Sequence, residues 1–152
     1  MATCTPATLD RRIQVAALLR RAAALCRSGW CRGCSAQNET GARVTSVALA
    51  PANPSPSEVA LSPVRFDVGS AMFRAIAVAK VPKGSRKEMS QLLYLSVPST
   101  RRHLLDEAQA AFCRTAGAVH PSIWNDQTCK SGDQAADMLE RAANEVMKNG
   151  RA

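Results

Sequence analysis

Three stretches of this chain repeat small apolar side chains, chiefly alanine, at the spacing of one helix face. They cover residues 8–27, 100–116 and 131–149. In the first stretch the apolar face consists of Val15, Leu18, Leu19, Ala22, Leu25 and Cys26. Alanine favours helices, whereas strands favour aromatic and β-branched residues, and the 152 residues include only three Phe, two Trp and one Tyr. The pattern therefore predicts helices that pack closely through small side chains.

The expected ends of these helices carry capping and stop signals. Pro6 suits the first turn of the first helix, and Gly29 can end that helix in a left-handed conformation. Gly117 is placed to end the second helix. Ser131 and Gln134 form a capping box at the start of the third helix. All three helices therefore have boundaries that the sequence predicts.

The segment that follows the first helix has a different character. The polar run at residues 38–41 is a turn signal, and we predict a β-hairpin with residues 31–37 and 42–49 as its strands. Four prolines in residues 50–63 predict an extended loop, because proline fixes one backbone dihedral and has no amide hydrogen to donate.

A further helix is predicted over residues 68–80, where Asp67 or Ser70 can act as the cap. The proline-containing segment 121–126 is expected to be a loop. Neither half of the chain is rich enough in large apolar residues to form a separate core, so residues 1–152 are expected to form a single domain. The predicted fold class is α+β, mostly helical, with about four helices and a small β-hairpin.

The formal net charge of +8 favours a negatively charged partner: nucleic acid, an acidic protein or an anionic surface. Residues 1–65 carry eight basic and three acidic side chains, so the excess is concentrated towards the N-terminus. Asp137 and Glu140 can pair with Arg141 and neighbouring bases at helical spacing. The candidate partner-binding surface consists of Arg11, Arg12, Arg20, Arg21, Lys83, Arg86, Lys87, Arg101 and Arg102.

We therefore expect a non-enzymatic interaction protein that binds an acidic protein or a nucleic-acid-associated complex through this basic surface. A nucleic-acid-binding module is the main alternative, although the sequence has no helix-turn-helix, RNA-recognition or zinc-finger signature and few aromatic residues to stack on bases. No apolar run approaches the ~20 residues that span a bilayer, so no membrane partner is expected. The expected location is the cytoplasm, while the arginine-rich residues 8–27 also fit a mitochondrial transit peptide.

A W-C-x-x-C segment at residues 30–34 raises a second alternative, a zinc- or thiol-dependent enzyme. Thioredoxin-like sites place this segment between a strand and a helix, whereas here a helix precedes it and a turn-rich segment follows. Cys31 and Cys34 have the spacing of one zinc knuckle, but the chain has no second pair with that spacing. We therefore assign no catalytic residue, no metal site and no cofactor.

Three short motifs carry a family resemblance: a helix that ends near W-x-x-G, a central helix of small residues, and W-N-D before the closing helix. The residues concerned are Trp30, Gly33, Gly69, Trp124, Asn125 and Asp126. In this order the chain resembles a family of small uncharacterised bacterial and phage proteins. The resemblance implies a shared fold pattern and a bacterial or phage source, but no reaction. Residues 50–63 and 80–102 look like insertions into that pattern.

The resemblance also bears on function. An accessory protein of a phage or mobile element that modulates host machinery would fit a basic, non-enzymatic binding protein. The motif residues have no assigned role at this point. For Trp124, Asn125 and Asp126 we expect an Asx-type turn that caps a helix, with the indole packed beneath it.

Overall fold

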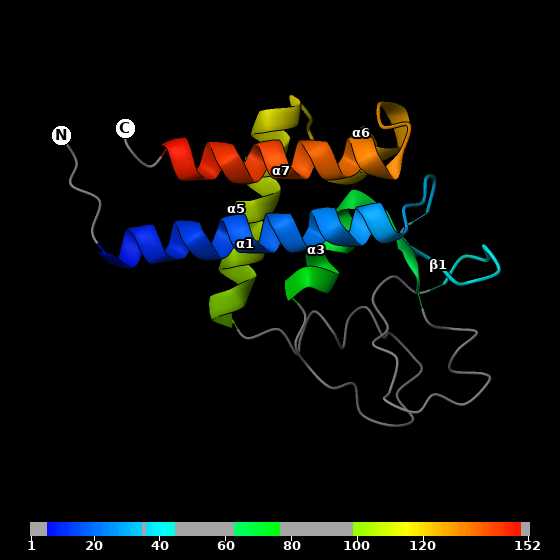
Figure 1. Ribbon diagram of the computed structural model, residues 1–152, viewed down its shortest axis with the longest axis horizontal. Coiled ribbons are helices and arrows are strands. Elements are labelled where there is room, and N and C mark those ends of the chain that lie inside the picture. The colour runs from blue at the N-terminus through cyan, green and yellow to red at the C-terminus, as the bar shows by residue number, and fades with distance from the viewer. Residues whose placement is uncertain (1–5, 35, 45–62, 77–98, 150–152) are drawn as a thin grey trace, which may run out of the picture.

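The computed structural model describes residues 6–34, 36–44, 63–76 and 99–149 (Figure 1). This part of the chain holds five helices and two short strands. In chain order they are α1 (Pro6–Ser28), β1 (Ala36–Gln37), β2 (Arg65–Phe66), α3 (Val68–Ile76), α5 (Ser99–Ala116), α6 (Pro121–Gln127) and α7 (Gly132–Asn149). The predicted class, a mostly helical α+β fold with a small antiparallel β-element, is confirmed.

α1 and α7 form the central helix pair. They lie side by side and run in opposite directions, and α5 crosses both of them (Figure 1). Both helices bury alanines completely: Ala16, Ala22 and Ala23 in α1, and Ala135, Ala136, Ala142 and Ala143 in α7. Alanine loses no side-chain entropy on burial and occupies little volume, so helices with alanine faces can pack at high density.

The largest core side chains come from α1, α3, α5 and, with Leu139, α7. Leu18 and Leu19 of α1, Met72 of α3 and Phe112 of α5 are fully buried. Phe112 packs edge-to-face against Trp124 of α6, with ring centroids 5.2 Å apart and an interplanar angle of 81°. Aromatic pairs of this geometry add roughly 0.5–1.5 kcal/mol beyond the burial of their surface. The indole therefore anchors α6 to α5.

The helix ends follow the stop signals in the sequence. α1 begins at Pro6 and ends immediately before Gly29, and α5 ends immediately before Gly117. The predicted left-handed conformation of Gly29 is wrong, because its φ is not positive. Gly117 has a φ of 67°, the left-handed conformation that glycine adopts without strain. α3 is described as far as Ile76, and the last residues of the predicted helix 68–80 lie outside the described part.

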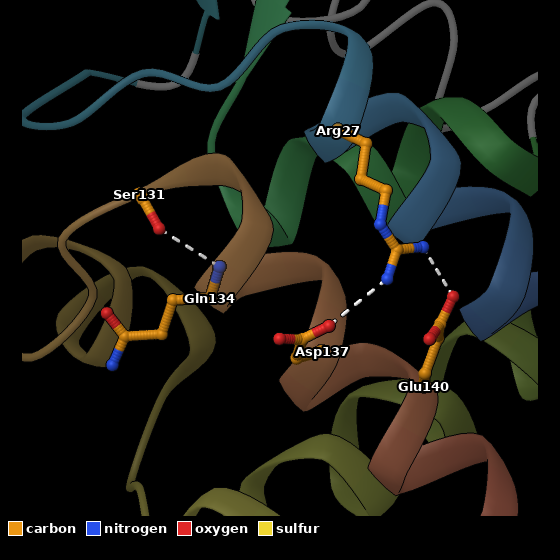
Figure 2. A network of polar contacts seen from close by, with 5 residues as sticks. All are labelled: Arg27, Ser131, Gln134, Asp137 and Glu140. Carbon is orange, nitrogen blue, oxygen red and sulfur yellow. Dashed lines mark hydrogen bonds and ion pairs between the residues drawn. The ribbon is translucent and has the colours of Figure 1, made fainter.

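The cap of α7 at Ser131 is confirmed, while the reciprocal bond of Gln134 goes to the residue before the cap. Ser131 Oγ accepts a hydrogen bond from the Gln134 amide at 3.1 Å (Figure 2). In return Gln134 Oε1 accepts a hydrogen bond from the Lys130 amide at 2.9 Å. Two amide groups that no helical carbonyl could reach are thereby satisfied, which is why the helix begins here.

The β-element differs from the predicted hairpin in its partner strand. β1 pairs antiparallel with β2, with Ala36 opposite Phe66 and Gln37 opposite Arg65. The predicted partner was residues 42–49, of which those from 45 onwards lie outside the described part. A turn signal reports only local pairing, so it could not show that a segment far along the chain would complete the sheet.

The predicted turn itself is present. Asn38 Oδ1 accepts hydrogen bonds from the amides of Thr40 and Ala42 at 3.0 and 2.9 Å. The turn returns the chain to a single antiparallel bridge between Gln37 and Arg43. An asparagine that bonds to the backbone ahead of it is the usual chemistry of such a turn.

The predicted loop at residues 121–126 is wrong, because these residues lie in α6. Pro121 occupies the first turn, and Nδ1 of His120, the N-cap residue, accepts a hydrogen bond from the Ser122 amide at 3.2 Å. Proline is favourable at this position because its missing amide hydrogen would have no helical acceptor. A helix this short shows no repeating apolar face, so the proline and the polar residues pointed to a loop.

The two predicted insertions fall largely outside the described residues. Only Pro63 of the segment 50–63 is described, and only residues 99–102 of the segment 80–102, where they open α5. None of the described helices is long and apolar enough to cross a membrane.

Candidate functional site

The first candidate site is a junction where the end of α1, the start of α3 and α6 meet. Its centre is Asn125, which is 0 % exposed. Asn125 Oδ1 accepts hydrogen bonds from Trp30 Nε1 at 2.7 Å and from the Val68 amide at 3.1 Å. Its Nδ2 donates to the Cys31 carbonyl at 3.0 Å and to Asp126 Oδ1 at 3.1 Å. The hydrogen-bonding capacity of this amide, two donors and two acceptor positions, is therefore fully used.

Asp126 extends the junction to the loop that follows α1. Its Oδ1 accepts a hydrogen bond from the Gly33 amide at 2.8 Å, and its carbonyl accepts one from Arg32 Nε at 2.7 Å. Gly33 has a φ of 76°, where a residue with a side chain would be strained. Glycine therefore lets the loop turn so that its amide meets the carboxylate.

Asp67 completes the junction at the start of α3. Its buried carboxylate accepts hydrogen bonds from the Ser70 amide at 2.7 Å and from Ser122 Oγ at 3.1 Å. The predicted cap at Asp67 is thus confirmed. A Cβ on Gly69 would lie 3.3 Å from Ser122 Oγ, so the missing side chain lets α3 approach α6. Burial raises the pKa of Asp67, because the charged carboxylate loses contact with water.

We define the junction as Trp30, Gly33, Asp67, Gly69, Trp124, Asn125 and Asp126. It contains all six residues that carried the family resemblance. The expected Asx-type turn at residues 124–126 is wrong, because these residues lie within α6. Asn125 instead accepts a hydrogen bond from the first amide of α3, 57 residues earlier in the chain. The Trp124 indole packs on Phe112 of α5. Because the hydrogen bonds of Asn125 are all made within the chain, we assign the junction a structural role.

The second candidate site is a cavity of about 640 Å³ between α1, α5 and α7, which we call the arginine cavity. It is lined by Arg12, Val15, Glu107, Ala110, Ala111, Arg114, Thr115, Arg141, Glu145 and Val146. Its volume falls within the range of roughly 300–1,000 Å³ that is usual for small-ligand pockets. It adjoins the N-terminal half of α1, whereas the junction lies beyond the C-terminal end of that helix.

Three guanidinium groups, one from each helix, line the arginine cavity: Arg12, Arg114 and Arg141. Arg12 is half-buried, and its Nη1 donates to the Met147 carbonyl at 3.4 Å. Arg114 and Arg141 are exposed, and neither forms an ion pair or hydrogen bond with another residue of the described ranges. Their charges are therefore available to an anion from outside the chain.

The two carboxylates of the cavity have cationic neighbours beyond its lining. Glu107 Oε1 lies 2.8 Å from Arg11 Nε, and Glu145 Oε1 lies 3.9 Å from Lys148 Nζ. Exposed pairs of this kind contribute about 0–1 kcal/mol each to stability. The ion pairs of the two glutamates are nevertheless formed with Arg11 and Lys148, and not with the cavity arginines.

An ion-pair cluster between α1 and α7 engages the two carboxylates that helical spacing assigns to Arg141. Helical spacing predicts that Asp137 and Glu140 pair with Arg141. Instead, Arg27 of α1 binds both carboxylates, with Nη2 3.1 Å from Asp137 Oδ1 and Nη1 bonded to Glu140 Oε1 (Figure 2). The hydrogen bond and the positive charge of Arg27 lower the pKa of Glu140. The predicted pairing within α7 is therefore wrong.

Comparison with known proteins places the chain in a family. A model described as a family of unknown function (DUF6197) matches residues 10–145. The chain belongs to this family. The matched region contains the whole junction and all three cavity arginines, and the match agrees with the resemblance to an uncharacterised family. No curated protein and no solved structure matches the chain.

The four arginines predicted on the first helix do not share one face of α1. Successive residues of a helix turn by about 100°, so Arg11, Arg12, Arg20 and Arg21 point in four directions. Arg11 pairs with α5, Arg12 lines the cavity, and Arg20 Nη2 donates to Asn144 Oδ1 of α7 at 3.4 Å. Arg21 is exposed. The structure therefore brings Arg11 and Arg12 to the arginine cavity and its edge.

The other predicted basic residues belong to the central segment of the chain. Lys83, Arg86 and Lys87 lie outside the described residues. Arg101 belongs to α5, but its side chain is outside the described part, and Arg102 is half-buried in the first turn of that helix. Arg102 does not line the arginine cavity.

Cys31 and Cys34 lie beside the junction. Cys31 is buried, and its Sγ donates a hydrogen bond to the Cys34 carbonyl at 3.4 Å. Burial raises the pKa of the Cys31 thiol, which disfavours the thiolate that disulfide exchange and zinc binding require. Within the part of the chain that the structure describes, no three His, Cys, Asp or Glu residues are grouped to hold a metal ion.

Sequence reasoning missed Arg114 and Arg141. Arg114 follows Glu107 by two helical turns, and Arg141 precedes Glu145 by one, which are ordinary spacings on solvated helices. Nothing in either segment shows that the two arginines share a cavity. Only the packing of α5 against α7 brings them together.

Proposed function

We propose that this protein is a non-enzymatic interaction protein that binds an acidic partner through the arginine cavity. The observation that supports the proposal is the pair Arg114 and Arg141, which line the same cavity from two helices without a carboxylate partner in the described chain. Guanidinium groups recognise anionic oxygens in a two-pronged geometry, and a net charge of +8 attracts acidic partners. The partner is an acidic protein, alone or in a nucleic-acid-associated complex.

The proposed biological role is that of an accessory protein of a phage or mobile element that modulates host machinery in the cytoplasm. The resemblance to small bacterial and phage proteins supports this role. Such a protein acts by occupying a partner, so it requires a binding site and no catalytic group. The arginine cavity meets that requirement with side chains from three helices that the core holds in place.

The test is capture of partners from a host lysate by the full chain, followed by a charge-reversed variant. We expect an acidic protein to be retained by the wild type and lost by the double variant Arg114→Glu/Arg141→Glu. Arg21→Glu is the matched control, because Arg21 is exposed on α1 and does not line the cavity. Equal retention by the double variant and by this control would remove the proposal.

Nuclease treatment of the same lysate separates the proposal from the nucleic-acid-binding alternative. Retention of an acidic protein should survive nuclease. If the purified chain binds DNA or RNA with an affinity that falls steeply as salt is added, and nuclease abolishes capture, the alternative replaces the proposal. Absence of nucleic-acid binding at low salt removes the alternative.

A further inference from the structure

We infer that the chemical group accepted by the arginine cavity is a phosphate monoester, an inference that rests on the proposed function and specifies its ligand. Among the residues that the structure describes, Arg114 and Arg141 of the cavity have no carboxylate partner. A guanidinium group has no acceptor and five N–H donors. The anion that fits this pair carries two negative charges and enough oxygens for two guanidinium groups.

Charge and geometry favour phosphate over a carboxylate. A phosphate monoester carries about −1.5 to −2 charges at neutral pH and has three acceptor oxygens. It can therefore accept paired hydrogen bonds from Arg114 and Arg141 together, whereas a single carboxylate brings one charge and two oxygens. A phosphodiester of nucleic acid also carries one charge, so it matches the pair less well than a terminal phosphate.

The cavity also contains two carboxylates, whose positions bear on where an anion could bind. Glu107 and Glu145 line it, yet their ion pairs are with Arg11 and Lys148. Glu107 precedes Arg114 by seven residues, which is about 10 Å along α5, so an anion held at Arg114 stays well away from this glutamate. Glu145 follows Arg141 by four residues, about 6 Å along α7, so it is the carboxylate nearer to the proposed anion.

The rest of the lining suits the carbon portion of an ester. Val15 and Ala111 are buried, and Val146 is half-buried, so the cavity has apolar walls beside its arginines. Apolar walls exclude water from one side of a bound group, which strengthens the hydrogen bonds that it makes. Six of the ten lining residues are polar or charged, so the apolar part of the lining is the smaller part.

The experiment titrates the full chain with O-phosphoserine, inorganic phosphate and glutamate, and follows binding by calorimetry and by the NMR signals of the arginine side chains. We expect O-phosphoserine to bind at least ~10-fold more tightly than glutamate, as expected for stronger charge-assisted hydrogen bonds. Arg114→Ala and Arg141→Ala should each weaken O-phosphoserine binding by ~10-fold or more. Arg21→Ala should leave it unchanged.

A conservative variant separates a specific contact from a general effect of charge. Arg141→Lys keeps the positive charge but loses the planar fork, so it should weaken O-phosphoserine binding by several-fold. Inorganic phosphate distinguishes the source of the ligand. Tighter binding of O-phosphoserine than of phosphate indicates a phosphorylated side chain or small ester, and equal binding indicates the free anion; both results support the monophosphate chemistry.

Three results would separate this inference from the proposed function. If glutamate binds as tightly as O-phosphoserine, the phosphate inference fails and an acidic partner remains. If O-phosphoserine binds as expected but charge reversal leaves partner capture intact, the cavity binds phosphate and the proposed function fails. If Arg114→Ala, Arg141→Ala and wild type all bind every probe equally, the phosphate inference fails and the capture experiment alone decides the proposed function. Circular dichroism of each variant confirms that the helices are intact.

Discussion

The junction and the arginine cavity both gather polar side chains from distant parts of the chain, but their polar groups are used differently. At the junction, the buried amide of Asn125 makes all of its hydrogen bonds within the protein. At the cavity, Arg114 and Arg141 have no hydrogen-bond or ion-pair partner among the described residues. The junction and the three cavity arginines lie within the family match, so membership of the family alone does not distinguish their roles.

The difference separates stability from binding. A buried polar group that is fully satisfied holds segments together, and its removal leaves several partners unpaired. An exposed charge without a partner contributes little to stability and remains available to a ligand. The junction therefore stabilises the packing of α1, α3 and α6, and the cavity is the site of the proposed function. The predictions below test that division, from the largest expected effect on stability to the smallest.

Asn125→Ala should have the largest effect. It leaves Trp30 Nε1, the Val68 amide and the Cys31 carbonyl without the partner that they have now. A buried polar group left unsatisfied costs about 1–3 kcal/mol, so the free energy of unfolding should fall by at least about 3 kcal/mol. Urea denaturation measures this change. Asn144→Ala, at an exposed position of α7, is the control, and an equal loss in both variants would contradict a structural junction.

Asp67→Ala should have the next largest effect. It removes the hydrogen bonds that the carboxylate accepts from the Ser70 amide and from Ser122 Oγ. Loss of a helix cap costs about 0.5–2 kcal/mol of stability. Asp67→Asn retains an oxygen for the Ser70 amide and removes the buried charge, so at neutral pH it should be at least as stable as the wild type. Thermal or urea unfolding at neutral pH checks both variants.

The pH dependence of the free energy of unfolding, compared between the wild type and Asp67→Asn, gives a second measurement. Burial raises the pKa of Asp67 above its ordinary value of 3.8, so the folded state holds this proton more tightly than the unfolded state. The resulting stabilisation is complete below the unfolded pKa and is lost as pH rises through the folded pKa. The stability of the wild type relative to Asp67→Asn should therefore improve as pH falls. A relative stability that improves with rising pH would contradict the burial of this carboxyl.

Arg27→Ala should have a smaller effect, because its ion pairs with Asp137 and Glu140 are exposed to solvent (Figure 2). We expect a modest loss of stability that shrinks as salt is added. Arg27 lowers the pKa of Glu140 below its ordinary value of 4.5, so the stabilisation is present above the unfolded pKa and lost as pH falls through the folded pKa. Denaturation at two salt concentrations measures the effect. Salt-independent destabilisation would indicate a packing role for the arginine.

Arg114→Ala and Arg141→Ala should have the smallest effect on stability. Both side chains are exposed and unpaired in the described chain, so each change should stay within about 0.5 kcal/mol of the wild type. The same variants are expected to lose most of their affinity for O-phosphoserine. Unfolding curves and titrations on one preparation make the comparison direct. Destabilisation as large as that of Asn125→Ala would show that the cavity is part of the structural framework.

Much of the fold follows from the sequence, because helix formation depends on residues within a few positions of one another. The apolar repeat with Pro6, Gly29 and Gly117 predicted the limits of α1 and the end of α5, and Ser131 with Gln134 predicted the start of α7. The seven residues of α6 form too few turns for a repeating face, so that helix was missed. The strand partner of β1 was missed because it lies far along the chain.

The candidate sites depend on tertiary structure to a greater degree. The motifs marked Trp30 and Asn125, but neither motif indicates that the indole of one donates to the amide of the other. Helical spacing assigned Arg141 to neighbours in its own helix, whereas the packing of α1 against α7 gave those carboxylates to Arg27. The sequence by itself therefore determined where helices form and which faces they bury. Only the tertiary structure decided which charges are paired and which remain free, because pairing depends on distances between elements that local spacing does not encode.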